Sequence, residues 1–125
     1  MAVIAKFSLD RKVIFMHDKE IERFKLEIYV PESHMDALQS TLQSAGAGRI
    51  GKYDSCLSYS RVRSTWRPLV GAKPYNGFEG IATTEDELKV EVIVLKSKLA
   101  ETLQAIRSVH PYEEPVINVI PLYGG

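Results

Sequence analysis

The segment from His110 to Pro115 (HPYEEP) brings an imidazole, a phenol and two carboxylates together between two prolines. Each proline fixes its own φ and biases the preceding residue toward extended geometry, so the segment is stiff and non-helical. Imidazole and carboxylate ligands suit zinc or another divalent ion, which makes His110, Glu113 and Glu114 candidate metal ligands. The alternative for His110 is a cap, because a cation at the end of a helix complements the helix dipole.

Two further observations bear on the chemistry of this segment. Cys56 is the only cysteine, and its thiolate would strengthen a zinc or copper site if the second strand approaches the last one. A lone cysteine in a strand is more often a small buried hydrophobe, and this alternative stays open. Glu113 and Glu114 are adjacent, so in an extended chain they point to opposite faces, which argues against a paired acid and base. A non-enzymatic module is therefore expected, with a metal-dependent hydrolase that uses His110, Glu114 and Cys56 as the runner-up.

A basic segment lies between positions 49 and 73, where Asp54 is the only acid. Its basic residues are Arg49, Lys52, Arg61, Arg63, Arg67 and Lys73. Arginine forks suit phosphate or carboxylate, so a small anionic ligand is expected, with Arg49, Tyr53, Arg67 and Tyr112 as its binding residues. The alternative is that these charges are neutralised by nearby acids within or between subunits. Interleaved aromatic residues would also suit stacked nucleic acid, but the net charge is zero and nucleic acid is not expected.

Residues 46–51 match the pattern G-x-G-x-x-G. A dinucleotide site needs a strand before these glycines and a helix after them, so that the phosphates meet a helix N-terminus. Here the expected order is reversed, with a helix before and a strand after. The glycines are therefore predicted to end the helix and to allow close backbone packing.

The elements that must position these residues form two similar units. Leu26–Val30 is predicted as a strand, and a helix follows Pro31 with an apolar stripe. A second strand at Lys89–Val94 and a helix from about Ser97 repeat this order 64 positions later. The predicted stripes are Met35, Leu38, Leu42 and Ala45 in the first helix, and Leu99, Leu103 and Ile106 in the second.

Another strand follows each unit, at about Asp54–Ser60 and Val116–Leu122. The order β-α-β, insert, β-α-β predicts an α+β, ferredoxin-like split β-α-β fold, with an antiparallel sheet that carries two helices on one face. Residues 61–88 are predicted as a long inserted loop, with a short hairpin near Phe78–Thr83. The other sheet face is expected to be bare and apolar, with Tyr29 and Ile93 on it, so that self-association would cover it.

Length and composition indicate the number of domains, the class of protein and its expected location. The 125 residues fit one domain, and 45% hydrophobic with 26% charged residues is ordinary for a globular protein. No apolar run approaches the roughly 20 residues of a membrane span, and charged residues interrupt the N-terminal apolar ones, so a cytoplasmic location is expected. Residues 1–24 are interpreted as an N-terminal extension with a hairpin of strands at 3–9 and 13–16, and residues 25–125 as the domain.

Four motifs in order carry a family resemblance: VPESH at 30–34, GAGRIGKYDSC at 46–56, RPLVGA at 67–72 and HPYEEP at 110–115. From Lys25 to Leu122 the chain resembles the PII/CutA-like domain of Nif-three-like dinuclear-metal proteins and the stand-alone proteins made of that domain. The HPYE segment is also similar to that of the CutA divalent-ion tolerance family.

The resemblance implies a ferredoxin-like regulatory or binding module and a homotrimer of the CutA or PII kind. The two metals of the larger relatives lie in a different domain, so that site is not carried over to this chain. A purely structural oligomerisation domain, with Trp66 and Tyr112 as packing anchors, is a further alternative.

Overall fold

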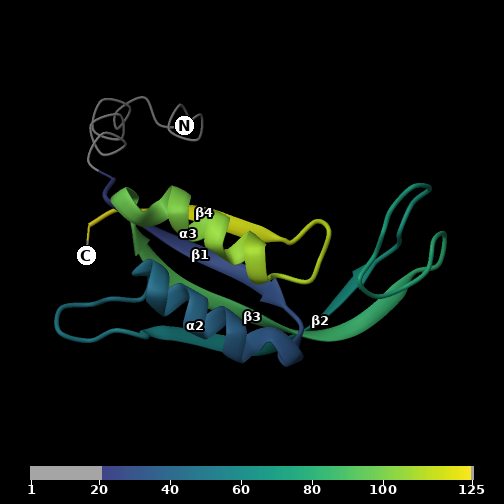
Figure 1. The fold of residues 1–125 in the computed structure, drawn as a ribbon, viewed down its shortest axis with the longest axis horizontal. Helices are drawn as coiled ribbons and strands as arrows, with labels where there is room; N and C mark the ends of the chain where they lie inside the picture. Colours follow the sequence, from purple (N-terminus) through teal and green to yellow (C-terminus); the bar gives the residue numbers. More distant parts are fainter. Residues whose placement is uncertain (1–20, 125) are drawn as a thin grey trace, which may run out of the picture.

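The computed structural model describes residues 21–124, and the predicted strands at 3–9 and 13–16 lie outside this range. Its four strands pair antiparallel in the order β2-β3-β1-β4, and both α-helices cover one face of the sheet (Figure 1). The α+β ferredoxin-like prediction is therefore confirmed. None of the helices in residues 21–124 is long and apolar enough to cross a membrane. The elements are β1 (Arg23–Val30), η2 (Glu32–His34), α2 (Met35–Ala45), β2 (Leu57–Trp66), β3 (Thr83–Leu95), α3 (Lys96–Val109) and β4 (Ile117–Leu122).

The core lies between the helices and the covered sheet face. Alternate residues of β1 and β3 point into it, and the stripe of α2 fills the space above them. The apolar stripes are confirmed for α2, whose Met35, Leu38 and Leu42 are buried. Of the predicted stripe in α3 only Ile106 is fully buried, while Leu99 and Leu103 are partly buried against the core; Thr102 of the same helix is fully buried as well.

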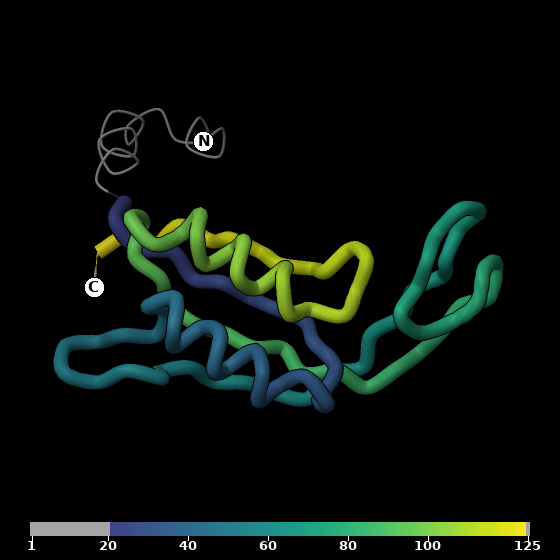
Figure 2. Tube along the Cα trace, viewed as in Figure 1, coloured from purple at the N-terminus to yellow at the C-terminus, as the bar shows by residue number. Residues whose placement is uncertain are grey.

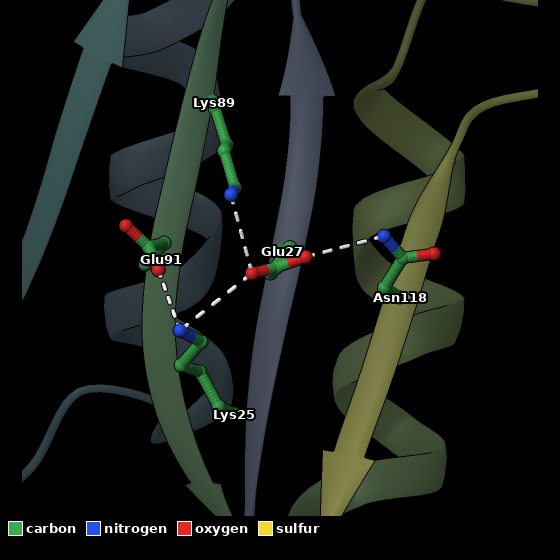
Figure 3. A network of polar contacts seen from close by, with 5 residues as sticks. All are labelled: Lys25, Glu27, Lys89, Glu91 and Asn118. Carbon is green, nitrogen blue, oxygen red and sulfur yellow. Dashed lines mark hydrogen bonds and ion pairs between the residues drawn. The ribbon is translucent and has the colours of Figure 1, made fainter.

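The open face of the sheet is charged at its centre, so the expectation of an apolar face is wrong. Tyr29 and Ile93 do lie on this face, because they pair with Lys89 and Lys25. Around them, Lys25 Nζ lies 2.6 Å from Glu91 Oε1 and 3.6 Å from Glu27 Oε2 (Figure 3). The ion pairs and hydrogen bonds satisfy these groups without a covering partner.

Glu27 is the hub of this polar network. Its carboxylate accepts a hydrogen bond from Asn118 Nδ2 at 3.2 Å and lies 3.4 Å from Lys89 Nζ. The bond from Asn118 and the two lysines hold the pKa of Glu27 below its usual value, while the hydrogen bond to Glu91 raises the pKa of Lys25. The sheet therefore keeps strong charge pairing on the face that has no helix.

The predicted long loop is mostly strand. β2 and β3 pair without interruption from Leu57↔Val92 to Trp66↔Thr83, so only residues 67–82 form a loop. The predicted hairpin at Phe78–Thr83 is wrong, because Thr83 already begins β3. We call residues 61–88 the hairpin arm; it extends past the helices at one end of the sheet (Figures 1 and 2). Its strands lack a helix-covered face, which explains why they show no apolar alternation.

The glycines of the G-x-G-x-x-G pattern act structurally, as predicted. Gly46 ends α2 with a φ of +89°, and Ala47 N–H donates to the Leu42 carbonyl at 3.0 Å. Gly48 N–H donates to the Ile93 carbonyl at 2.8 Å, and a Cβ on Gly48 would lie 2.9 Å from the Cys56 carbonyl oxygen. The turn can lie against β3 only because this position has no side chain.

Candidate functional site

A cleft of about 680 Å³ lies at the end of the open face, between loop 67–82 and the HPYEEP segment. The arm curls toward this segment, so two regions far apart in sequence form its walls. Its lining is mainly apolar and aromatic with a few charged groups, as is usual for ligand pockets. The aromatic and charged residues of its lining are Tyr29, Trp66, Arg67, Tyr75, Glu87, Tyr112, Glu113 and Glu114.

Tyr112 is the centre of the aromatic lining. Its ring centroid lies 5.9 Å from that of Tyr75, 6.0 Å from that of Trp66 and 4.8 Å from that of His110. Its hydroxyl donates to Glu87 Oε2 at 2.6 Å. Burial, and then the neighbouring Glu87, raise the pKa of Tyr112, so the phenol stays protonated.

The arm holds Trp66 in place through a backbone hydrogen bond. The indole Nε1–H donates to the Asn76 carbonyl at 2.9 Å. The next residue, Gly77, has a φ of +101°, and a Cβ there would lie 3.3 Å from the indole nitrogen and 2.7 Å from Thr83 Oγ1. The loop therefore closes around Trp66 only with glycine at this position.

His110 ends α3 through its backbone N–H, which donates to the Ile106 carbonyl at 3.0 Å, while its side chain bonds elsewhere. Its Nδ1 accepts a hydrogen bond from Tyr112 N–H at 3.2 Å, so the neutral ring carries its proton on Nε2, which donates to the Tyr29 carbonyl at 2.7 Å. The side chain is buried, and burial lowers the pKa of His110. The expected cation at the helix end is therefore wrong, and His110 instead joins α3 to β1.

Glu113 and Glu114 both line the cleft, and the expectation that their side chains point to opposite faces stays a prediction. The chain bends at these residues, and the period-two alternation of an extended strand does not apply there. Glu113 Oε1 accepts a hydrogen bond from Lys73 N–H at 3.0 Å, which joins the HPYEEP segment to the arm. Both acidic residues thus belong to the lining of one cavity.

Three of the predicted site residues lie at the other end of the sheet. Cys56, Arg49 and Tyr53 belong to the connection between α2 and β2 (Figure 1), while the cleft lies at the far end of β2. That strand has ten residues and spans about 30 Å. The structure therefore brings Arg67 and Tyr112 together and leaves Arg49 and Tyr53 apart from them.

Cys56 does not approach the last strand, as the zinc or copper hypothesis required. It precedes β2, and β2 and β4 form opposite edges of the sheet. The thiol is partly exposed and lies 3.6 Å from the Asp54 carbonyl. Among residues 21–124 no three His, Cys, Asp or Glu side chains are grouped to hold a metal ion, and metal binding stays a prediction.

The basic segment is neutralised in part. Arg61 pairs with Glu32 at 2.8 Å and Arg63 with Asp86 at 2.9 Å, both on the exposed surface, where such pairs contribute little stability. The guanidinium of Arg67 forms no ion pair with any residue that the structure describes. It is therefore the cation that the arm brings to the cleft.

Three cleft residues were missed from the sequence. Glu87 lies in a run of acids and was not predicted as a site residue, yet it is only 4% exposed and lines the cleft. Tyr29 was expected on the open face, but not in a site. Tyr75 was not predicted as a site residue; its ring lies 5.8 Å from that of the half-buried His34, nearly perpendicular to it. The missing signal was the strand pairing of the arm, which places Glu87 and Trp66 on one face.

Comparison with solved structures shows which proteins share this fold. CutA1 from Oryza sativa superimposes with a TM-score of 0.62 at 18% identity and covers 84% of each chain. GlnK from B. subtilis superimposes with a TM-score of 0.57 at 19% identity. These likenesses establish a CutA/PII-like fold.

Sequence similarity gives a more particular relationship. No known protein-family model matches the chain. A GTP cyclohydrolase 1 type 2 homolog from Halalkalibacterium halodurans is 37% identical over 99 residues, which cover 79% of this chain and 27% of the relative. One from Mycobacterium tuberculosis is 40% identical over 100 residues, covering 78% and 26%. The chain thus spans about a quarter of the length of the curated relatives it matches.

A solved structure points to the same relationship. A Bacillus cereus protein related to NIF3 superimposes with a TM-score of 0.71 at 31% identity, over 82% of this chain and 26% of that one. The predicted resemblance to the PII/CutA-like domain of the Nif-three-like family is therefore confirmed.

Proposed function

We propose that the chain is a small regulatory module that binds a ligand in the cleft beneath the hairpin arm. The observation that carries the proposal is the junction of loop 67–82 with the HPYEEP segment, which joins aromatic rings and carboxyl groups around one cavity. The CutA- and PII-like fold supports a binding role.

The protonated hydroxyl of Tyr112, which contacts Glu87 in the cleft, favours ligand binding over catalysis. Its raised pKa makes this hydroxyl a poor nucleophile and a poor base. Its bond to Glu87 serves to orient the ring. A hydrolase therefore remains the alternative with less support.

We propose the same cleft for the ligand classes predicted from sequence. A small anion would bind at Arg67, and a divalent metal at Glu113 and Glu114. A metal on His110 would have to replace one of the two hydrogen bonds of the imidazole. Elemental analysis, followed by zinc and copper titration of wild type and Glu114→Gln, tests the metal; stoichiometric metal that the variant loses would support it.

The only tryptophan, Trp66, lies in the cleft and reports on occupancy by its fluorescence. Purified protein would be titrated with metals, nucleotides, carboxylates and amines. We expect a saturable change for one class that Tyr75→Ala weakens and Tyr53→Ala, at the other end of the sheet, leaves intact. No saturable change with any class would contradict the proposed function.

We also infer self-association, with a homotrimer as the predicted state. Apolar side chains of the arm are strongly exposed, including Val70 at 91% and Phe78 at 74%. Exposed apolar groups gathered on a projecting element are typical of contact surfaces.

A further inference from the structure

We propose that the cleft recognises an organic cation, with an alkylammonium or guanidinium group that lies among Trp66, Tyr75 and Tyr112 and pairs with Glu87. This inference rests on the proposed binding function and names the chemistry of the ligand. It differs from the anion and metal predicted from sequence, because it follows from residues that only the folded arm brings together.

Glu87 is a buried acidic residue in the lining of the cleft. Its side chain is 4% exposed, and its hydrogen bond comes from the neutral hydroxyl of Tyr112. No lysine, arginine or histidine of residues 21–124 forms an ion pair with it. A buried carboxylate is strongly unfavourable unless a positive charge accompanies it.

His110 does not supply that charge. The negative charge of Glu87 favours the protonated imidazole, but burial has the larger effect and lowers the pKa of His110. Both ring nitrogens are also engaged, with the Tyr29 carbonyl and with the Tyr112 amide. Arg67 also lines the cleft, but its guanidinium is exposed and forms no ion pair with Glu87. The positive charge that complements Glu87 is therefore assigned to a bound ligand.

The other charges of the cleft point the same way. Glu113 and Glu114 add two carboxyl groups to that of Glu87, against one guanidinium from the exposed Arg67. Walls of low dielectric concentrate the field of such groups in the cavity. An anion placed beside Glu87 would be repelled, whereas a cation would be attracted by all three acids.

The aromatic rings provide the matching surface. The ring of Tyr112 is tilted by 49° to Trp66 and by 47° to Tyr75, and all three residues line the cleft. Ammonium and guanidinium groups bind to such faces, most strongly to tryptophan. Rings with a buried carboxylate behind them form a site for an organic cation.

The test uses agmatine as a guanidinium probe and tetramethylammonium chloride as an ammonium probe, with sodium phosphate and sodium acetate as anions at matched ionic strength. Calorimetry and Trp66 fluorescence of the full chain measure binding. Glu87→Gln removes the charge but keeps an acceptor for Tyr112, and Glu101→Gln, exposed on α3, is the matched control. We expect Glu87→Gln to weaken agmatine binding by about tenfold or more, and the control to leave it unchanged.

The same experiment separates a free small molecule from a basic side chain of a second copy. If a second copy supplies the cation, Glu87→Gln lowers the oligomer mass in sedimentation equilibrium, and agmatine competes with assembly. If a free molecule supplies it, the mass is unchanged and only probe binding weakens. Either result supports cation recognition by Glu87.

Three results would overturn the inference. Saturable binding of phosphate or acetate without binding of either cation would leave a binding module but exclude the proposed ligand class. Equal agmatine affinity and equal mass in wild type and Glu87→Gln would remove Glu87 from recognition. No response of Trp66 to any probe or other ligand class, with unchanged mass, would contradict both the inference and the proposed function.

Discussion

Tyr112 contributes to the candidate site by holding Glu87 as well as by lining the cleft. The hydroxyl donates to a carboxyl group that is almost completely buried. A buried acceptor that loses its donor retains the full cost of its desolvation. The stability of the chain and the order of its cleft therefore depend on the same hydrogen bond.

Tyr112→Phe is expected to lower the free energy of unfolding by about 1–3 kcal/mol, because Glu87 loses its donor. Urea unfolding measures the change. The matched control is Tyr53→Phe, since Tyr53 is 75% exposed. Equal stability of Tyr112→Phe and wild type would show that the hydrogen bond contributes nothing net.

His110 should give the chain a pH-dependent stability. The folded state binds the imidazole proton less readily than the unfolded chain, because burial lowers the pKa of His110 from its usual 6.5. The stability is complete above about pH 6.5 and falls as the pH drops from there toward the lowered pKa.

Urea unfolding between pH 7.5 and pH 5 would detect this loss in wild type. His110→Gln keeps an amide donor but cannot titrate, so its stability should vary less over this range. His34→Gln is the control and should retain the slope of wild type. A wild-type slope that survives in His110→Gln would assign the dependence to another group.

At the scale of elements, the sequence predicts those helices and strands that have a regular apolar pattern. The stripe of α2 and the alternation of β1 and β3 are visible because a helix-covered face demands apolar residues at fixed periods. One side of the arm is exposed and the other is only partly covered, so β2 carries no regular apolar period and was expected to end too early. The HPYEEP half of the cleft was found from its residue types, but Glu87 needed the register of β3.

Gly77→Ala should disrupt the arm more than Gly71→Ala does. Both glycines have positive φ, at +101° and +90°, so alanine is strained at either position by about 1 kcal/mol. Only at Gly77 would the new Cβ also collide, 2.7 Å from Thr83 Oγ1, whereas nothing lies within 4 Å at Gly71. We expect altered Trp66 fluorescence and weaker probe binding in Gly77→Ala alone; equal effects of both changes would mean that strain, not crowding, matters.

For the whole molecule, the arm carries a group of strongly exposed apolar side chains. The charged open face does not require a partner, so the reason given from sequence for self-association does not hold. The exposed apolar side chains of loop 67–82 provide a different reason. The arm, and not the sheet face, is therefore the surface on which the predicted self-association is tested.

Val70→Ser with Phe78→Ser is expected to lower the oligomer mass while far-UV circular dichroism stays unchanged, because both side chains lie outside the core. Sedimentation equilibrium gives the mass. Leu95→Ser, at the opposite end of β3 and also exposed, is the control and should assemble as wild type does. An unchanged mass in the double variant would place the contact elsewhere.

The pairing of β1 with β4 has a consequence for how the chain folds. Arg23 pairs with Leu122, so the sheet joins residues close to the two limits of the described chain, whereas β2 and β3 meet across a short loop. Contacts across such separations form late, because closing a long loop costs entropy before any contact compensates it. During synthesis β1 emerges early and keeps one edge unpaired until β4 appears. That edge is a template for the strands of neighbouring nascent chains, so aggregation competes with folding until the last strand is in place.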